Sequence, residues 1–244
     1  MNDSDKKVVM ITGASRGLGR ALALAFAREG ASLSICARNW ASLLKVKEAA
    51  EALGSKVLAV SADVGHPRDV ERFAAVTEET FGQVDVLINN ASIIGPSPMP
   101  LLLDYPEEDF MEVLKVNAFS PFLVTRRVLP GMLQRNRGSI INVTSEAGNT
   151  GYAGWGAYGI SKFALEGLTE TWADELQGTN IKINMVDPGE MDTQMHALAV
   201  PECDYPLAKP ESLTGVFLYL ASEKSAGISG RRFEAQGFRG VEPL

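Results

Sequence analysis

Short apolar runs alternate along the chain with longer segments in which apolar residues recur at helical spacing. The short runs predict strands over residues 8–12, 32–37, 56–61, 84–89, 139–144, 181–186 and 231–234. The longer segments predict helices over residues 18–28, 40–53, 67–81, 107–135, 158–177 and 211–221. This alternation favours right-handed crossovers and parallel strands. We therefore expect an α/β fold: a doubly wound (Rossmann), seven-stranded, mainly parallel sheet with helices on both faces.

The length and composition fit one such domain over residues 1–244, since no linker-like composition break divides the chain. Hydrophobic residues make up 45% and charged residues 22%, close to the globular average, which excludes disordered and fibrous classes. Lys and Arg number 23 against 30 Asp and Glu. The resulting net charge of −7 argues against nucleic acid as a partner.

The expected compartment is the cytoplasm. No apolar run reaches the roughly 18–20 residues that span a bilayer, so no membrane partner is expected. The first residues are polar and lack the apolar core of a secretory signal. Cys36 and Cys203 are too few for a disulfide framework, which fits a reducing compartment.

The first predicted strand runs directly into a glycine-rich turn, and a helix follows. The turn reads Gly13-Ala14-Ser15-Arg16-Gly17-Leu18-Gly19. Glycines at such a turn let the backbone approach a pyrophosphate, with free N–H groups and the helix dipole facing it. A tight turn without a ligand is the alternative, but the order of strand, turn and amphipathic helix favours a dinucleotide site.

The end of the second predicted strand bears on the choice of dinucleotide. Sites that prefer NAD(H) place a carboxylate there for the adenosine 2′-hydroxyl, whereas this chain has Ala37 followed by Arg38. Arg38 and Arg16 together suit a 2′-phosphate, because guanidinium groups bind phosphate with paired hydrogen bonds. We therefore expect NADP(H) rather than NAD(H); two solvated surface arginines are the alternative.

Three residues in the second half of the chain suit proton transfer. Tyr158 and Lys162 lie four positions apart, so a helix places them on one face. A free tyrosine has a pKa of about 10, and a nearby ammonium is expected to lower it. Ser145 follows a predicted buried strand, where its hydroxyl suits an oxygen that gains charge during hydride transfer. No Gly-x-Ser-x-Gly elbow surrounds Ser145, so a hydrolase is not favoured.

The chain resembles the short-chain dehydrogenase/reductase family over nearly its whole length. The resemblance rests on motifs in the family's order: Thr12 with the glycine-rich turn, Asp63-Val64, Asn89-Asn90-Ala91, Asn117, Ser145, Tyr158 with Lys162, and Pro188-Gly189 with Thr193. It implies that Tyr158 is the general acid/base and that Lys162 binds the nicotinamide ribose. It further implies that Ser145 orients the substrate oxygen, and that Asn117 supports a water-linked proton relay through Lys162.

The same resemblance, together with the argument above for Arg16 and Arg38, gives the expected cofactor contacts. They are Gly13, Ser15, Arg16, Gly17, Leu18, Gly19, Arg38, Asp63, Val64, Asn90, Ala91, Tyr158, Lys162, Pro188, Gly189, Met191 and Thr193. Asp63 is implied to bond the adenine, and residues 188–193 to hold the nicotinamide. Ser92 departs from the family pattern, since a glycine usually follows the Asn-Asn-Ala motif.

The resemblance implies an enzyme that interconverts a ketone or aldehyde and an alcohol with NADP(H), its small-molecule substrate lying among the loops after the strands. A dinucleotide-binding regulatory or scaffold protein without turnover is the alternative, although such a protein needs no proton-transfer group. The resemblance also implies a homo-oligomer, a dimer or a tetramer. His66 and His196 lack ligand partners at suitable spacing, so no metal site is expected.

Overall fold

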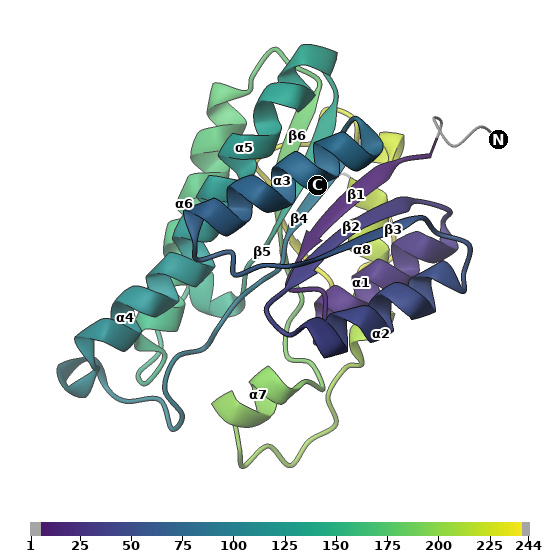
Figure 1. Ribbon diagram of the computed structural model, residues 1–244. Coiled ribbons are helices and arrows are strands. Elements are labelled where there is room, and N and C mark those ends of the chain that lie inside the picture. The colour runs from purple at the N-terminus through teal and green to yellow at the C-terminus, as the bar shows by residue number, and fades with distance from the viewer. Residues whose placement is uncertain (1–5, 241–244) are drawn as a thin grey trace.

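The computed structural model describes residues 6–240, whose strands form one sheet (Figure 1). The strands are β1 (Val8–Thr12), β2 (Ser32–Ala37), β3 (Val57–Ser61), β4 (Val86–Asn89), β5 (Gly138–Val143), β6 (Ile181–Asp187) and β7 (Arg232–Glu234). They lie in the order β3-β2-β1-β4-β5-β6-β7, and every neighbouring pair is parallel. The predicted α/β fold with a seven-stranded parallel sheet is confirmed.

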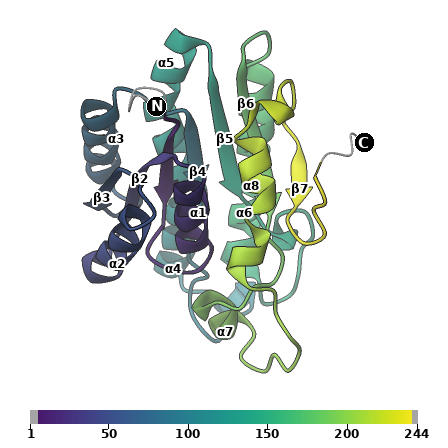
Figure 2. The same ribbon diagram turned by 90° about the vertical axis from the view of Figure 1, so that its right-hand side faces the viewer.

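Helices cover both faces of the sheet (Figures 1 and 2). One face carries α1 (Gly17–Arg28), α2 (Trp40–Glu51) and α8 (Gly215–Leu220). The other carries α3 (Pro67–Phe81), α5 (Ser120–Arg135) and α6 (Gly156–Glu175). Two further helices lie toward the carboxyl ends of the strands: α4 (Glu107–Leu114), which packs against α6, and α7 (Gln194–Ala199).

The strands are apolar on both faces because helices cover both. In β1, Val9 and Ile11 pack into the cluster beneath α1 and α8, whereas Met10 packs into the cluster beneath α3 and α5. Successive side chains of a strand point to opposite faces, so a strand buried on both sides is apolar at every position. This explains why the central strands are uninterrupted apolar runs in the sequence.

The helix predicted over residues 107–135 is interrupted. It consists of α4, a π-helical segment over Lys115–Phe119, and α5. Asn117 lies in the middle of that segment, and its buried amide bonds both backbone groups of Ile93. Pro121, four residues later, has no N–H to donate to the Asn117 carbonyl. These two features account for the local departure from α-helical geometry.

The segment after β6 also differs from the prediction. Residues 191–207, which show no helical pattern, contain the short helix α7. The helix predicted over 211–221 divides into a 3₁₀ turn, Pro210–Leu213, and α8. Its apolar residues Leu213, Phe217 and Leu220 are buried in the core. Within residues 6–240, no helix has both the length and the apolar character needed to cross a bilayer.

The order of the strands determines where a ligand can bind. The chain moves outward from β1 to β2 and β3, then returns to the other side of β1 for β4 and β5. Loops at the carboxyl ends of β1 and β4 therefore leave in opposite directions and open a crevice between them. The candidate functional site lies in this crevice, at the carboxyl ends of the strands.

Candidate active site

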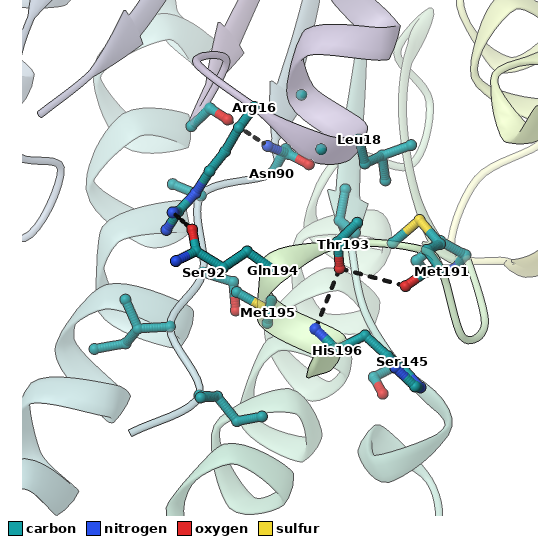
Figure 3. Close-up of a pocket in the computed structure, with 18 of the residues that line it drawn as sticks. Arg16, Leu18, Asn90, Ser92, Ser145, Met191, Thr193, Gln194, Met195 and His196 are labelled. Atoms are coloured by element: carbon teal, nitrogen blue, oxygen red, sulfur yellow. Dashed lines mark hydrogen bonds between the residues drawn. The ribbon is translucent and has the colours of Figure 1, made fainter. Parts of the chain in front are cut away.

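A cavity of about 1010 Å³ lies at the carboxyl ends of β1 to β6 (Figure 3). Every residue predicted to contact the cofactor lines it, and so does Ser145. These residues come from seven separate segments between residues 13 and 193. The fold thus brings the glycine-rich turn and the proposed proton-transfer residues to one hollow, while their contact with a cofactor stays a prediction.

The turn between β1 and α1 has the backbone that its glycines allow. Gly13 and Gly17 have positive φ angles of 67° and 52°, which side chains other than glycine rarely adopt. A Cβ on Gly19 would collide with the Gly13 carbonyl oxygen. A Cβ on Gly13 would lie 2.8 Å from the Ala91 Cα. Gly13 and Gly19 therefore serve close packing of the turn against its neighbours.

The loop after β4 is bonded to the glycine-rich turn. The Thr12 hydroxyl accepts hydrogen bonds of 3.0 Å from the backbone N–H groups of Asn90 and Ala91. The Asn90 side-chain amide donates to the carbonyl oxygens of Thr12 and Gly13, at 2.9 and 3.1 Å. Figure 3 shows Asn90 pointing at the turn. Asn90 therefore holds the turn in place, a role in addition to the one the family resemblance implied.

The end of the cavity beside β2 holds both predicted arginines. Ala37 is buried at the end of β2, and the guanidinium of the exposed Arg38 bonds no other residue within 6–240. The Arg16 side chain donates to the Gln194 side chain across the cavity (Figure 3). The Asp63 carboxylate accepts from the Gly65 N–H at 2.9 Å, which fixes it after β3.

The three proton-transfer candidates meet at the other end. Ser145 follows β5 and accepts a 3.3 Å hydrogen bond from the Ala147 N–H. Tyr158 and Lys162 lie one turn apart in α6 and are both buried. The Lys162 ammonium donates to the Val143 carbonyl at 2.9 Å and lies 5.4 Å from the centre of the Tyr158 ring. The Trp155 ring packs against Tyr158, with centroids 5.7 Å apart.

The acid–base properties of the pair differ from the sequence-based expectation. Burial raises the pKa of Tyr158 to about 12; the Ser145 hydroxyl acts in the opposite direction, and the Asp187 carboxylate adds to the rise. Burial lowers the pKa of Lys162 to about 8, although the nearby Asp187 and Glu166 carboxylates act to raise it. The net direction for Tyr158 is therefore upward, because desolvation of the phenolate is the largest effect, and a lowering of the tyrosine pKa by Lys162 stays a prediction.

Asn117 is the one predicted site residue that does not line the cavity. Its side-chain oxygen accepts from the Ile93 N–H at 2.8 Å, and its amide donates to the Ile93 carbonyl and the Ser161 hydroxyl. Its side chain therefore joins the loop after β4 to α6, one residue from Lys162. A part in a proton relay stays a prediction.

Several lining residues escaped the sequence analysis. Thr193, a predicted contact, caps α7 by accepting from the His196 N–H at 3.2 Å. His196 in turn lies 3.1 Å from the Glu190 carboxylate, which also accepts from the Tyr205 hydroxyl. Figure 3 shows Gln194, Met195 and His196 on this helix at the cavity. A helix of six residues leaves too short a pattern to be recognised in a sequence.

The cavity fits a dinucleotide on observations independent of the family resemblance. Gly13 and Gly17, both at positive φ, leave the turn without side chains, and the Arg38 guanidinium has no protein partner in the described chain. The Ser92 hydroxyl, a cavity-lining group buried from water, has no hydrogen-bond partner there either. Within residues 6–240, no group of three His, Cys, Asp or Glu side chains is placed to hold a metal ion.

The packing of the glycine-rich turn gives a direct test. Gly19→Ala is expected to weaken dinucleotide binding at least about tenfold, since the added methyl group displaces the Gly13 carbonyl and with it the turn. The measurement is the dissociation constant by calorimetry. Gly167→Ala, in α6 with open space around it, is the matched control and should leave binding unchanged. Equal binding by both variants would contradict the assignment of the turn.

Comparison with known proteins agrees with this geometry. A family model described as short chain dehydrogenase matches residues 7–203. The 3-oxoacyl-[acyl-carrier-protein] reductase FabG of Thermotoga maritima is 38% identical, over 92% of this chain and 94% of that protein. The 2-(R)-hydroxypropyl-CoM dehydrogenase of Xanthobacter autotrophicus is 36% identical, over 95% and 97%. A solved short chain dehydrogenase from Pseudomonas syringae has a TM-score of 0.90 at 39% identity, and 97% of each chain is covered.

The match extends from β1 through α7, and so includes the glycine-rich turn, Ser145 and the Tyr158–Lys162 pair. The relatives align over nearly their full lengths as well. The chain therefore belongs to the short-chain dehydrogenase/reductase family of oxidoreductases.

Proposed function

We propose that this protein is an NADP(H)-preferring reductase or dehydrogenase that interconverts a small carbonyl compound and its alcohol. The observation that carries the proposal is a single cavity lined by the glycine-rich turn at one end and by Ser145, Tyr158 and Lys162 at the other. The relatives named as a 3-oxoacyl reductase and a hydroxypropyl dehydrogenase support a reaction at a C–OH or C=O group.

In this proposal each side chain at the Ser145 end of the cavity has a role. The bound nicotinamide supplies or accepts the hydride. Tyr158 donates a proton to the substrate oxygen in reduction and takes it back in oxidation. Ser145, which lines the same cavity as Tyr158, holds that oxygen as it gains negative charge. Lys162, fixed by the Val143 carbonyl, holds the cofactor ribose next to Tyr158. The apolar residues Ile94 and Trp155 exclude water from the same end of the cavity.

The preference for NADP(H) rests on the end of β2. Ala37 offers no carboxylate to a ribose hydroxyl, and the Arg38 guanidinium is free to bond a 2′-phosphate. Arg16 reaches the same cavity. Related structures include one complexed with NADP and one bound to NAD⁺, so the family admits both cofactors. The proposed preference for NADP(H) therefore rests on Ala37, Arg38 and Arg16 of this chain and not on the cofactors of its relatives.

A regulatory or scaffold protein that binds a dinucleotide without turnover is the weaker candidate. Such a protein has no use for a serine, a tyrosine and a lysine gathered beside the cofactor. NADPH oxidation in the presence of a panel of ketones and aldehydes separates the two functions.

Replacing the proposed acid/base group tests the reaction. Tyr158→Phe is expected to lower kcat about 10²–10⁴-fold while NADPH still binds, because only the hydroxyl carries the proton. Tyr219→Phe is the matched control: Tyr219 is equally buried, at 9% exposure, but lies on α8 in the core cluster on the other face of the sheet from α6. A Tyr158→Phe enzyme with wild-type kcat would refute the role.

The high tyrosine pKa predicts opposite pH profiles for the two directions. With a pKa of about 12, Tyr158 is protonated at neutral pH. Reduction, which needs the hydroxyl proton, should keep its rate between about pH 6 and pH 9. Oxidation, which needs the phenolate, should rise about tenfold per pH unit over that range. The measurement is kcat against pH in both directions, and a flat oxidation profile would count against Tyr158 as the base.

Cofactor choice is tested by exchanging charge at the end of β2. The double variant Ala37→Asp with Arg38→Leu should weaken NADP(H) and favour NAD(H), because a carboxylate repels the phosphate and accepts from the ribose hydroxyl. Loss of a charge-assisted hydrogen bond costs about 1.5–3 kcal/mol, so the wild-type preference should be of order 10²-fold. The measurement is kcat/KM with both cofactors. Equal use of NADH by the wild type would show that these arginines do not bind the phosphate.

A homo-oligomer is the proposed assembly, supported by an apolar surface on α4, the π-helical segment and α6. Met111 is 62% exposed, and Phe119 and Phe163 are each 46% exposed. Ile160, on α6, is 41% exposed. An apolar surface of this kind suits a second copy of the chain related by a two-fold axis.

Charges placed on this surface should dissociate the assembly. Phe119→Glu with Phe163→Glu is expected to lower the mass measured by light scattering at micromolar concentration, because burial of carboxylates opposes association. Trp40→Glu, a change at an equally exposed residue on α2, is the control and should not alter the mass. A monomeric wild type would rule out the assembly.

A further inference from the structure

Arg232 bonds two carboxylates that belong to other elements. Its Nη2 lies 2.7 Å from the Asp187 Oδ2 at the end of β6, and its Nε lies 3.2 Å from the Glu166 Oε1 in α6. The side chains of Arg232, Asp187 and Glu166 are only 20%, 9% and 12% exposed. Glu234 lies farther from Arg232, at 3.7 Å, and is mostly exposed. Arg232, Asp187 and Glu166, named here the β7 ion cluster, carry one net negative charge.

The β7 ion cluster is linked to the segments that carry Ser145, the Tyr158–Lys162 pair and the predicted nicotinamide contacts. The Glu166 carboxylate accepts from the Thr144 hydroxyl at 2.6 Å, one residue before Ser145. Glu166 also lies one helical turn from Lys162. The other oxygen of Asp187 accepts from the Gly189 N–H at 2.8 Å, at the start of the segment predicted to hold the nicotinamide.

The cluster also sets the charge around the proton-transfer pair. The Asp187 carboxylate raises the pKa of both Tyr158 and Lys162, and Glu166 raises that of Lys162. Arg232 is the cation bonded to both carboxylates. Three other carboxylates on the elements around α6 have partners of their own: Glu146 bonds Tyr152, Glu190 bonds His196 and Tyr205, and Glu112 pairs with Lys115.

We propose that Arg232 is a positioning residue of this reaction, which fixes Asp187 and Glu166 behind the Tyr158–Lys162 pair and balances their charge. Arg232 does not line the cavity and lies beyond the part of the chain matched by the family model. It acts through the two carboxylates. This inference rests on the proposed function, since it concerns the acid–base chemistry of Tyr158 and Lys162.

The test is a series of variants that change the net charge of the β7 ion cluster. Arg232→Gln makes it more negative by one charge, and Asp187→Asn makes it neutral. The double variant Arg232→Gln with Asp187→Asn restores the wild-type charge without the arginine. Arg231→Gln is the matched control, because Arg231 precedes Arg232, is exposed, and forms hydrogen bonds only through its backbone.

Two measurements report how the net charge of the β7 ion cluster affects the Tyr158–Lys162 pair. The first is the pKa of Lys162, read by NMR titration of protein with ¹³C-labelled lysine and assigned with Lys162→Met. The second is the pH profile of kcat for alcohol oxidation. Arg232→Gln should raise the Lys162 pKa and shift the oxidation profile upward by about one pH unit, which lowers the rate at a fixed pH about tenfold. Asp187→Asn should shift both downward, and the double variant should return both close to wild type.

The outcomes separate this inference from the proposed function. If the Lys162 pKa and the pH profile of Arg232→Gln match those of Arg231→Gln, Arg232 does not act on the pair and the inference is wrong. If wild type and Tyr158→Phe have equal kcat, the proposed function is wrong, and the NMR titration still tests the charge balance. Should Arg232→Gln fail to fold, Asp187→Asn and the double variant test the inference, and an unmoved Lys162 pKa in Asp187→Asn overturns it.

Discussion

The shape of the cavity depends on the hydrogen bonds between the loop after β1 and the loop after β4, where the strand order reverses. Thr12, at the end of β1, accepts from two backbone N–H groups of the loop after β4, and Asn90 donates back to the turn after β1. Parallel strands alone bring their carboxyl ends to one edge. The hydrogen bonds hold the loops after β1 and β4 close together at that edge. The contacts at Gly13 and Gly19 are so close that no residue larger than glycine fits at either position.

Much of this structure could be predicted because its signals are local. The central strands are buried on both faces and read as unbroken apolar runs, and the helix periods are regular. The glycine spacing at β1 and the four-residue separation of Tyr158 and Lys162 each report a geometry set within one turn or one helix. Residues that satisfy such local rules lie in the cavity, including Arg38 at the end of β2.

The features that escaped prediction depend on contacts between distant segments. In the π-helical segment, the Asn117 side chain bonds the backbone of Ile93, 24 residues away. The β7 ion cluster joins Arg232 to a partner 66 residues earlier, and nothing in the local sequence pairs them. The direction of the Tyr158 pKa was also inaccessible, because it depends on how completely the surrounding elements exclude water from the hydroxyl.

Burial acts on the two central groups in opposite senses, and this has a chemical consequence. Burial raises the pKa of Tyr158, so the hydroxyl keeps its proton, and it lowers the pKa of Lys162, so the ammonium loses its proton more readily. The Asp187 carboxylate raises both pKa values: it adds to the effect of burial on Tyr158 and opposes the effect of burial on Lys162. A carboxylate behind the pair thus keeps the lysine charged and the tyrosine protonated, the state from which a carbonyl oxygen can be protonated. Two buried carboxylates without a counter-ion would be costly, and Arg232 provides that counter-ion without entering the cavity.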